Sequence, residues 1–346
     1  MVAYSSSAFT SESSSPATEI VQLPPVYTPD ELEEINSHLE TLSPQEILQW
    51  GVHNLPGLYQ STAFGLTGLA GTDMLSKLTP SPPPLIFFDT LYHFTETLDL
   101  RDKVHLRYPQ TPLYTYQPFD CSSPSEFESL YGTHLWETNE SLYDYLVKVE
   151  PAQRAYRELG VRAIITGRRA SQGGARSGLA ILEIDSTGLL KLNPFKKWSF
   201  KEVKAYLDEN DVPRNELLKQ GYKSVGDWHS TQKSVPVASA GGDGSVTASA
   251  SPASPVAAGA GAGAGAEDDG ERSGRWRGRE KTECGLHEDY FRMRKMALLA
   301  AGGLDKERRE SEMRIADDDR GNELALESVV RSPLGIIVSV EAEVRA

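Results

Sequence analysis

Apolar and polar positions along the chain switch repeatedly between the period of a strand and the period of a helix. Short apolar runs bounded by turn-forming residues predict strands at residues 57–65, 84–90, 112–117 and 162–167. Amphipathic segments predict helices at residues 66–78, 94–108 and 151–159, the last after a less regular stretch. Strands that alternate with helices of this length build a parallel sheet covered on both faces. The predicted fold class is α/β, an open, mostly parallel sheet with helices on both faces.

Local cap and turn signals extend this pattern at both ends. Two helices are expected at residues 28–40 and 43–55, where Thr28 and Ser43 are the expected N-caps. Residues 178–194 predict two strands joined by a Ser-Thr-Gly turn, and a helix capped by Ser199 follows.

Composition divides the chain into five segments. Residues 1–28 are a Ser/Pro-rich tail that we expect to be disordered, and 29–235 form the α/β domain. Residues 236–271 are rich in Ala, Gly and Ser and predict a linker, because they offer little apolar surface to bury. Residues 272–298 form a short tail with a Cys, and 299–346 an extension of unknown role, with a charged stretch to about Arg320 expected to be helical.

The net charge of −14 argues against a nucleic-acid partner, because phosphate backbones are bound by clustered Lys and Arg. No apolar run approaches the roughly 20 residues of a membrane helix, and the N-terminus lacks a secretory pattern. A cytoplasmic protein is therefore expected. Two basic islands, residues 167–176 and 272–281, stand out as places where a small anion could bind.

Two strand ends carry candidate ligand-binding residues, since ligands bind beyond the carboxyl ends of parallel strands. Residues 61–68, STAFGLTG, supply hydroxyls and glycines that let backbone approach a phosphate, although small residues also simply make turns. Asp89 and Thr90 end an apolar strand, where the buried acid either caps a helix or meets a ligand.

The stronger signal is the arginine-rich loop after the strand at residues 162–167. Arg168, Arg169 and Arg176 lie within ten residues, interleaved with Ser171 and Gln172. Guanidinium groups match the oxygens of phosphate and sulfate. An anion site is favoured over the alternative of a solvated basic loop.

The two cysteines differ in their charged neighbours. Cys121 follows Asp120, which opposes thiolate formation, so we interpret it as an ordinary free thiol. Cys284 has Lys281 and His287 nearby, which favour the thiolate, while Glu283 opposes it. Cys284 is the better candidate nucleophile.

Five segments taken in order resemble the phosphoadenylyl-sulfate reductases, especially the fungal ones: STAFGLTG, IFFDTLYHF, TGRRASQGGAR, GYKSVGDWHST and KTECGLHE. The resemblance covers most of residues 30–236 and resumes at about 272–291. Single motifs are weak here, whereas the ordered set with its Glu-Cys-Gly-Leu-His tail is specific.

The resemblance implies an adenine-nucleotide alpha-hydrolase type of fold and a step of sulfate assimilation. In that step, 3′-phosphoadenylyl sulfate and reduced thioredoxin give sulfite, adenosine 3′,5′-bisphosphate and oxidised thioredoxin. The position that matches the family nucleophile is Cys284, which would carry an S-sulfocysteine. The family also implies a homodimer.

Roles for the remaining residues follow from the chemistry and the resemblance together. Fixed positive charge must offset the repulsion between thiolate and sulfate, a task we assign to Arg168, Arg169, Arg176 and Lys281. His287 either orients the tail, stabilises the thiolate or packs structurally. The other expected substrate contacts are Ser61, Thr62, Phe64, Gly65, Asp89, Thr90, Gly167, Ser171 and Gln172, and, by resemblance only, Gly226, Asp227 and His229.

Motifs that the sequence lacks bear on which cofactors the chain can bind. With two cysteines far apart, the chain has no Cys-Cys pair and no Cys-x-x-Cys, so an iron–sulfur cluster is not expected. The reaction that the resemblance implies needs no metal or flavin. Two alternatives stay open. One is another adenylyl-transfer or ATP pyrophosphatase-type enzyme on the same fold, and the other is a non-catalytic nucleotide-binding regulator.

Overall fold

The structure, a computed structural model, describes residues 27–234, 271, 274–275, 285–300 and 302. The strands are β1 (Leu58–Thr62), β2 (Leu85–Phe88), β3 (Leu113–Tyr116), β4 (Ala163–Ile165), β5 (Leu182–Ile184) and β6 (Leu190–Leu192). The helices are α1 (Pro29–Leu39), α2 (Pro44–Asn54), α3 (Leu66–Leu78), α4 (Thr95–Arg107), α5 (Pro124–Tyr131), α6 (Leu135–Thr138), α7 (Glu140–Asp144), α8 (Glu150–Glu158) and α9 (Phe200–Glu209). A π-helical turn, η1 (Tyr145–Val149), joins α7 to α8. None of the helices in this part of the chain has the length and apolar character needed to cross a membrane.

The six strands form one sheet in the order β3-β2-β1-β4-β6-β5. Every neighbouring pair is parallel except β5 and β6, which are antiparallel. The predicted mostly parallel α/β sheet is confirmed. The chain runs outward from β1 to β3 and then returns to β4 on the other side of β1. This reversal creates a topological switch point between β1 and β4, where open α/β sheets bind their ligands.

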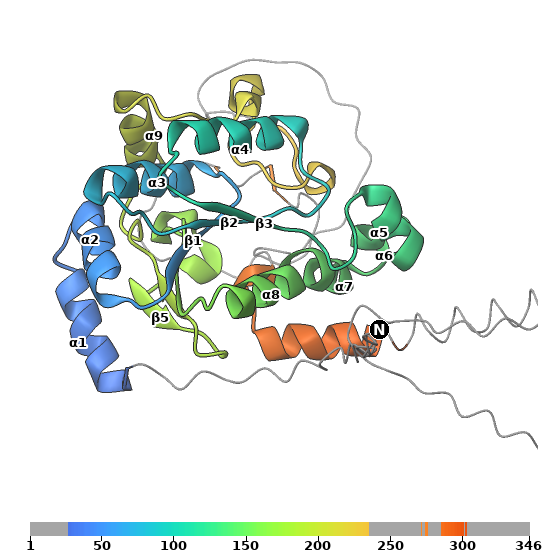
Figure 1. The fold of residues 1–346 in the computed structure, drawn as a ribbon, viewed down its shortest axis with the longest axis horizontal. Helices are drawn as coiled ribbons and strands as arrows, with labels where there is room; N and C mark the ends of the chain where they lie inside the picture. Colours follow the sequence, from blue (N-terminus) through green and yellow to red (C-terminus); the bar gives the residue numbers. More distant parts are fainter. Residues whose placement is uncertain (1–26, 235–270, 272–273, 276–284, 301, 303–346) are drawn as a thin grey trace, which may run out of the picture.

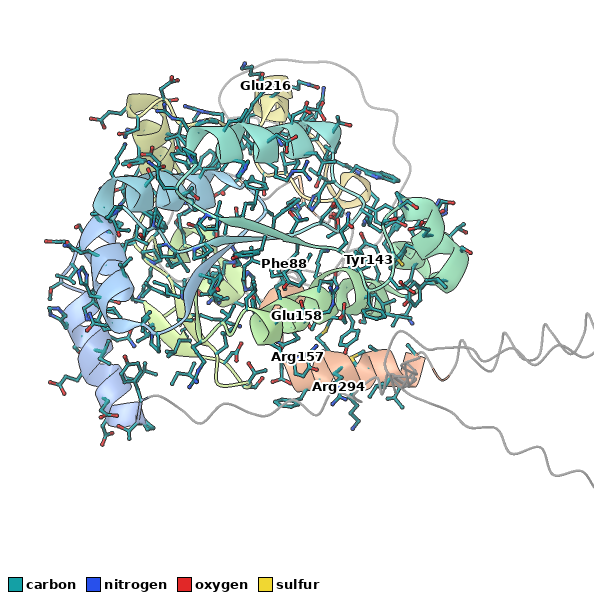
Figure 2. All side chains as sticks on the ribbon, in the orientation of Figure 1. Phe88, Tyr143, Arg157, Glu158, Glu216 and Arg294 are labelled. Atoms are coloured by element: carbon teal, nitrogen blue, oxygen red, sulfur yellow. The ribbon has the colours of Figure 1, made fainter. Side chains whose placement is uncertain are left out.

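Helices cover both faces of the sheet. Helices α3, α4 and α9 lie on one face and α8 on the other (Figure 1). Strand β2 shows why both faces are apolar. Its residues Leu85 and Phe87 belong to the core beneath α3 and α4, whereas Ile86 and Phe88 pack with alanines of α8 (Figure 2). Alternate residues of a strand point to opposite faces, so a strand buried on both sides is apolar throughout.

The predicted helix starts at Thr28, Ser43 and Ser199 are confirmed. Each side chain accepts a hydrogen bond from the backbone N–H three residues later, and the Glu at that position accepts one from the backbone N–H of the cap residue. These capping boxes satisfy donors that the first turn of a helix cannot pair internally.

The less regular stretch before α8 forms α5, α6, α7 and η1, which the sequence pattern did not predict. Phe127, Trp136 and Tyr143 of this stretch build, together with Tyr92 from the segment after β2, an aromatic cluster separate from the main core. Residues 290–300 are helical, as expected, and pack on the same cluster (Figure 1). Short helices of this kind depend on tertiary packing, which explains their weak sequence signal. The remainder of the helix expected up to about Arg320 lies outside the described residues.

Candidate functional site

A cleft of about 270 Å³ opens at the switch point, lined by the segments that follow β1, β2 and β4. The loops after β1 and β4 touch closely. A Cβ atom at Gly167 would lie 3.2 Å from the backbone nitrogen of Gly68. Glycine therefore lets the arginine-rich loop approach the start of α3.

Four predicted residues line the cleft: Ser61 and Thr62 at the end of β1, and Phe64 and Gly65 just after it. The Thr62 hydroxyl accepts a hydrogen bond from the Phe64 backbone N–H at 2.9 Å, which stabilises a turn with Phe64 at φ 55°. Gly65 is the N-cap of α3 and has no side-chain cap, and the first turn of α3 also lines the cleft. Backbone N–H groups at the start of this helix favour an anion there.

The arginine-rich loop divides between the cleft and the interior. Gly167, Arg168, Gln172 and Arg176 line the cleft. Ser171 does not, because its hydroxyl donates to the Trp198 carbonyl at 2.9 Å.

Arg169 is also absent from the cleft wall. It is fully buried, and its guanidinium donates to Thr67 Oγ1 at 3.1 Å and to Ser171 Oγ at 3.0 Å. It also forms an ion pair with Glu271, which itself lines the cleft. Arg169 therefore holds Glu271, which lies just before the tail in the chain. Its guanidinium does not face the cleft and is not placed to bind an anion there.

The two residues predicted at the end of β2 lie in different surroundings. Thr90 lines the cleft, and its hydroxyl donates to Asp227 Oδ1 at 2.6 Å. Asp89 lies away from the cleft. It accepts from the Leu91 backbone N–H at 3.0 Å and from the Gln117 amide at 3.0 Å. Asp89 is not the helix cap that the sequence allowed, because the N-cap of α4 is Phe94; it stabilises a turn in which Leu91 has φ 69°.

Asp227 is the most highly connected acid of the cleft. It is 2% exposed, and Lys148 Nζ lies 3.0 Å from its carboxylate, with His93 and His229 nitrogens at 3.9 and 3.8 Å. Burial alone would raise the pKa of Asp227, but Lys148, the two histidines and the Thr90 hydroxyl together hold that pKa well below its ordinary value. Asp227 is therefore ionised at neutral pH.

The other two residues predicted from the segment at residues 221–231 differ in position. Gly226 lines the cleft, and a Cβ there would come within 2.4 Å of the Arg275 guanidinium carbon, so glycine leaves room for that side chain. His229 lies behind the cleft wall. Its ring stacks on Trp136 at a centroid distance of 4.3 Å and its Nε2 is 2.9 Å from the Tyr143 hydroxyl.

Described parts of the tail reach the cleft from both sides of the predicted nucleophile. Upstream, the Gln232 backbone N–H donates to the Gly274 carbonyl at 2.8 Å, and Arg275 forms a β-bridge with Thr231. Downstream, Leu286 and His287 line the cleft. Cys284 and Lys281 lie outside the described residues.

Cys121 is buried, and its environment suppresses its reactivity. Burial first, and then the carboxylates of Glu126 and Asp120, raise the pKa of its thiol to about 11. The thiol is therefore protonated at neutral pH. Its interpretation as an ordinary free thiol agrees with this position.

Several cleft residues were not singled out from the sequence: Lys148, His93, Lys223, Arg275 and Glu271. Lys148 offered the clearest signal, because it interrupts the apolar run YLVKV, and π-helical turns such as this one are frequent at functional sites. Arg275 belongs to the second basic island. The cleft lining holds five Lys and Arg side chains and two carboxylates, and is thus basic in a chain of net charge −14.

Comparison with known proteins agrees with this geometry. Residues 57–233 match the family model described as the phosphoadenosine phosphosulfate reductase domain. Phosphoadenosine phosphosulfate reductase from Emericella nidulans is 49% identical over 265 residues, covering 76% of both chains. Its counterpart from Saccharomyces cerevisiae is 46% identical over 270 residues, covering 76% of this chain and 92% of the relative.

A solved structure extends the comparison. Phosphoadenylyl-sulfate reductase from Candida auris, crystallised as a phosphate complex, is 52% identical, with a TM-score of 0.55. The alignment covers 60% of this chain and 98% of that one. The fold, the basic cleft at its switch point and these matches lead to one conclusion: the chain belongs to the phosphoadenosine phosphosulfate reductase family.

Proposed function

We propose that this member of the family reduces 3′-phosphoadenylyl sulfate to sulfite with thioredoxin as the electron donor and Cys284 as the nucleophile. The observation that carries the proposal is the basic cleft at the switch point, which is framed by the start of α3 and by tail residues on both sides of Cys284. A nucleotide with two phosphate groups and a sulfate group both require such a site.

In the first step, the Cys284 thiolate attacks the sulfur atom of the sulfate group. A new S–S bond forms as the bond between that sulfur and the phosphate oxygen breaks, and the electron pair leaves with adenosine 3′,5′-bisphosphate. Cys284 then carries an S-sulfo group.

In the second step, a thioredoxin thiolate attacks the Cys284 sulfur, and sulfite leaves with the electron pair of the broken S–S bond. The second thioredoxin thiol resolves the mixed disulfide, which returns Cys284 as a thiolate and leaves thioredoxin oxidised. Two electrons pass from thioredoxin to the sulfate group, so the chain needs no resident redox group for this cycle.

Fixed positive charge makes the first step feasible, because a thiolate and a sulfate group repel each other. Arg168, Arg176, Lys148, Lys223 and Arg275 line the cleft and would supply that charge. Backbone N–H groups of the first turn of α3 would bind a phosphate of the nucleotide.

Intact-protein mass spectrometry tests this mechanism. The reduced chain is mixed with 3′-phosphoadenylyl sulfate without thioredoxin, and the same is done with Cys284→Ser and Cys121→Ser. One sulfo adduct is expected in the wild type and in Cys121→Ser, and none in Cys284→Ser. Thioredoxin should then release the adduct as sulfite. Substrate binding without an adduct would reject Cys284 as the nucleophile. A homodimer, a cytoplasmic location and the lack of a resident metal, flavin or iron–sulfur cluster stay predictions.

A further inference from the structure

The residue that follows Cys284 in the chain is held by a buried carboxylate. The backbone N–H of Gly285 donates to Asp144 Oδ2 at 3.2 Å, and the Asp144 side chain is only 3% exposed. Asp144 and Gly285 lie 141 residues apart, so the contact depends entirely on the tertiary fold. Hydrogen bonds from a backbone N–H to an ionised carboxylate are among the stronger ones in proteins.

Asp144 is itself held in place by Lys148. Lys148 Nζ lies 2.9 Å from Asp144 Oδ1 and 3.0 Å from Asp227 Oδ2. The π-helical turn η1 carries Lys148 one turn beyond Asp144. A single ammonium group therefore links the carboxylate that contacts the tail to the carboxylate in the cleft wall.

The site around Gly285 has no room for a side chain. A Cβ atom there would come within 3.1 Å of Asp144 Cβ and 3.2 Å of side-chain carbons of Met293 and Val149. Contacts this short force neighbours to move, and these neighbours are buried. The backbone at Gly285 thus fits closely against α7 and η1.

The helix after Gly285 anchors this contact. Tyr290, Met293 and Ala297 are buried in the aromatic cluster beside Tyr145 and Val149. Spacings of three and four residues place these three side chains on one face of the helix. The packing fixes the tail on the C-terminal side of Cys284.

We propose that Asp144 is a positioning residue for the sulfur-transfer reaction. It docks the tail through the N–H of Gly285, the residue that follows Cys284 in the chain. The inference rests on the proposed role of Cys284. It assigns a task to a residue in a segment that lacked a clear sequence pattern, and it explains why glycine follows the cysteine.

The test uses the full-length chain and the variants Asp144→Ala and Asp144→Asn. Hydrogen exchange of a peptide that begins at least two residues before Gly285, and so keeps its amide, reports docking. The single-turnover rate of S-sulfo formation at saturating 3′-phosphoadenylyl sulfate reports positioning. For Asp144→Ala we expect exchange about tenfold faster and sulfo transfer about tenfold slower, the effect of losing a hydrogen bond to a charged group. Asp144→Asn retains a side-chain oxygen that can accept from Gly285, so it should recover part of both. The affinity for adenosine 3′,5′-bisphosphate should change by less than about threefold, because neither variant alters the groups that bind the nucleotide.

Asp73→Ala is the matched control. Asp73 is also a buried acid paired with a lysine four residues later, with Lys77 Nζ at 2.6 Å, but it lies in α3 and packs with Tyr108 and Tyr206. It should lower the melting temperature without changing exchange at residues 285–300. Three results would overturn the proposal: unchanged exchange in Asp144→Ala, faster exchange with an unchanged sulfo-transfer rate, or the same acceleration in Asp73→Ala. If the wild type never acquires a sulfo group, the proposed function fails, and exchange still decides whether Asp144 docks the tail.

Discussion

Replacing Asp227 by Asn should destabilise the fold, because it removes a buried charge with close cationic partners. The carboxylate lies 3.0 Å from Lys148 Nζ and accepts from Thr90 at 2.6 Å and from Tyr143 at 3.3 Å. Asparagine keeps the shape and one acceptor oxygen. The change therefore isolates the charge.

The expected loss of unfolding free energy depends on the ion pair that Lys148 keeps after the substitution. Breaking a buried ion pair by removing one partner costs about 3 to 5 kcal/mol. Lys148 keeps Asp144 at 2.9 Å, so we expect the lower end, about 3 kcal/mol. In a domain of about 200 residues that loss lowers the melting temperature by about 6 to 12 °C.

The effect has a defined pH dependence. The surroundings lower the pKa of Asp227 in the folded state, so its charge stabilises the fold at every pH above the ordinary aspartate pKa. This contribution is lost as the pH falls through the folded-state pKa. The difference between wild type and Asp227→Asn should be full at neutral pH and shrink below about pH 4.

Thermal and urea unfolding at neutral and acidic pH measure these differences directly. Asp208→Asn is the control, because Asp208 pairs with Arg214 at the surface with its side chain 63% exposed, and should shift the unfolding free energy by under about 1 kcal/mol. An Asp227→Asn melting temperature within about 2 °C of the wild type would refute the reasoning.

Three further perturbations test other parts of the structure. Arg176→Met should weaken binding of adenosine 3′,5′-bisphosphate by about tenfold or more in calorimetry, since it removes a cation from the cleft, whereas Lys219→Met, at an exposed position, should have no effect. Cys121→Ser should leave turnover unchanged. Thiol labelling of the native protein at neutral pH should not modify Cys121, because its pKa is raised to about 11, and rapid labelling there would contradict its burial. Ser199→Ala should lower the unfolding free energy by about 1 kcal/mol through loss of the α9 cap, and an unchanged urea midpoint would show that the cap contributes nothing.

Local sequence signals were sufficient for most of the α/β domain. Capping boxes at Thr28, Ser43 and Ser199 fix helix starts within a few residues, and the apolar runs of β2 and β4 define strands buried on both faces. These signals involve residues close together in the sequence, so they can be recognised without knowledge of the fold. Between β3 and α8, only α5 has such a signal, with Ser123 as its N-cap and Pro124 at its first position; the helices after it are short and depend on aromatic packing.

The candidate site was only partly predictable. Arg168 and Arg169 are neighbours with the same chemistry, yet Arg168 lines the cleft and Arg169 is buried against Thr67 and Glu271. Arg169 is in an extended conformation, in which successive side chains point to opposite sides. Which of the two side chains faces the cleft depends on how the loop sits on the sheet, and the sequence does not specify this.

The amino-acid sequence by itself determined the fold class and the basic loop at the end of β4, because periodicity, caps and clusters of like charge are short-range features of the chain. The choice of Cys284 over Cys121 as the nucleophile stays a prediction. The tertiary structure alone decided that Lys148 joins Asp144 to Asp227, and that Asp144 meets the backbone of Gly285. These groups lie up to 141 positions apart, and burial is what makes their hydrogen bonds and charges strong. Only the packing of α7, η1 and the helix at residues 290–300 brings them together and excludes water from them.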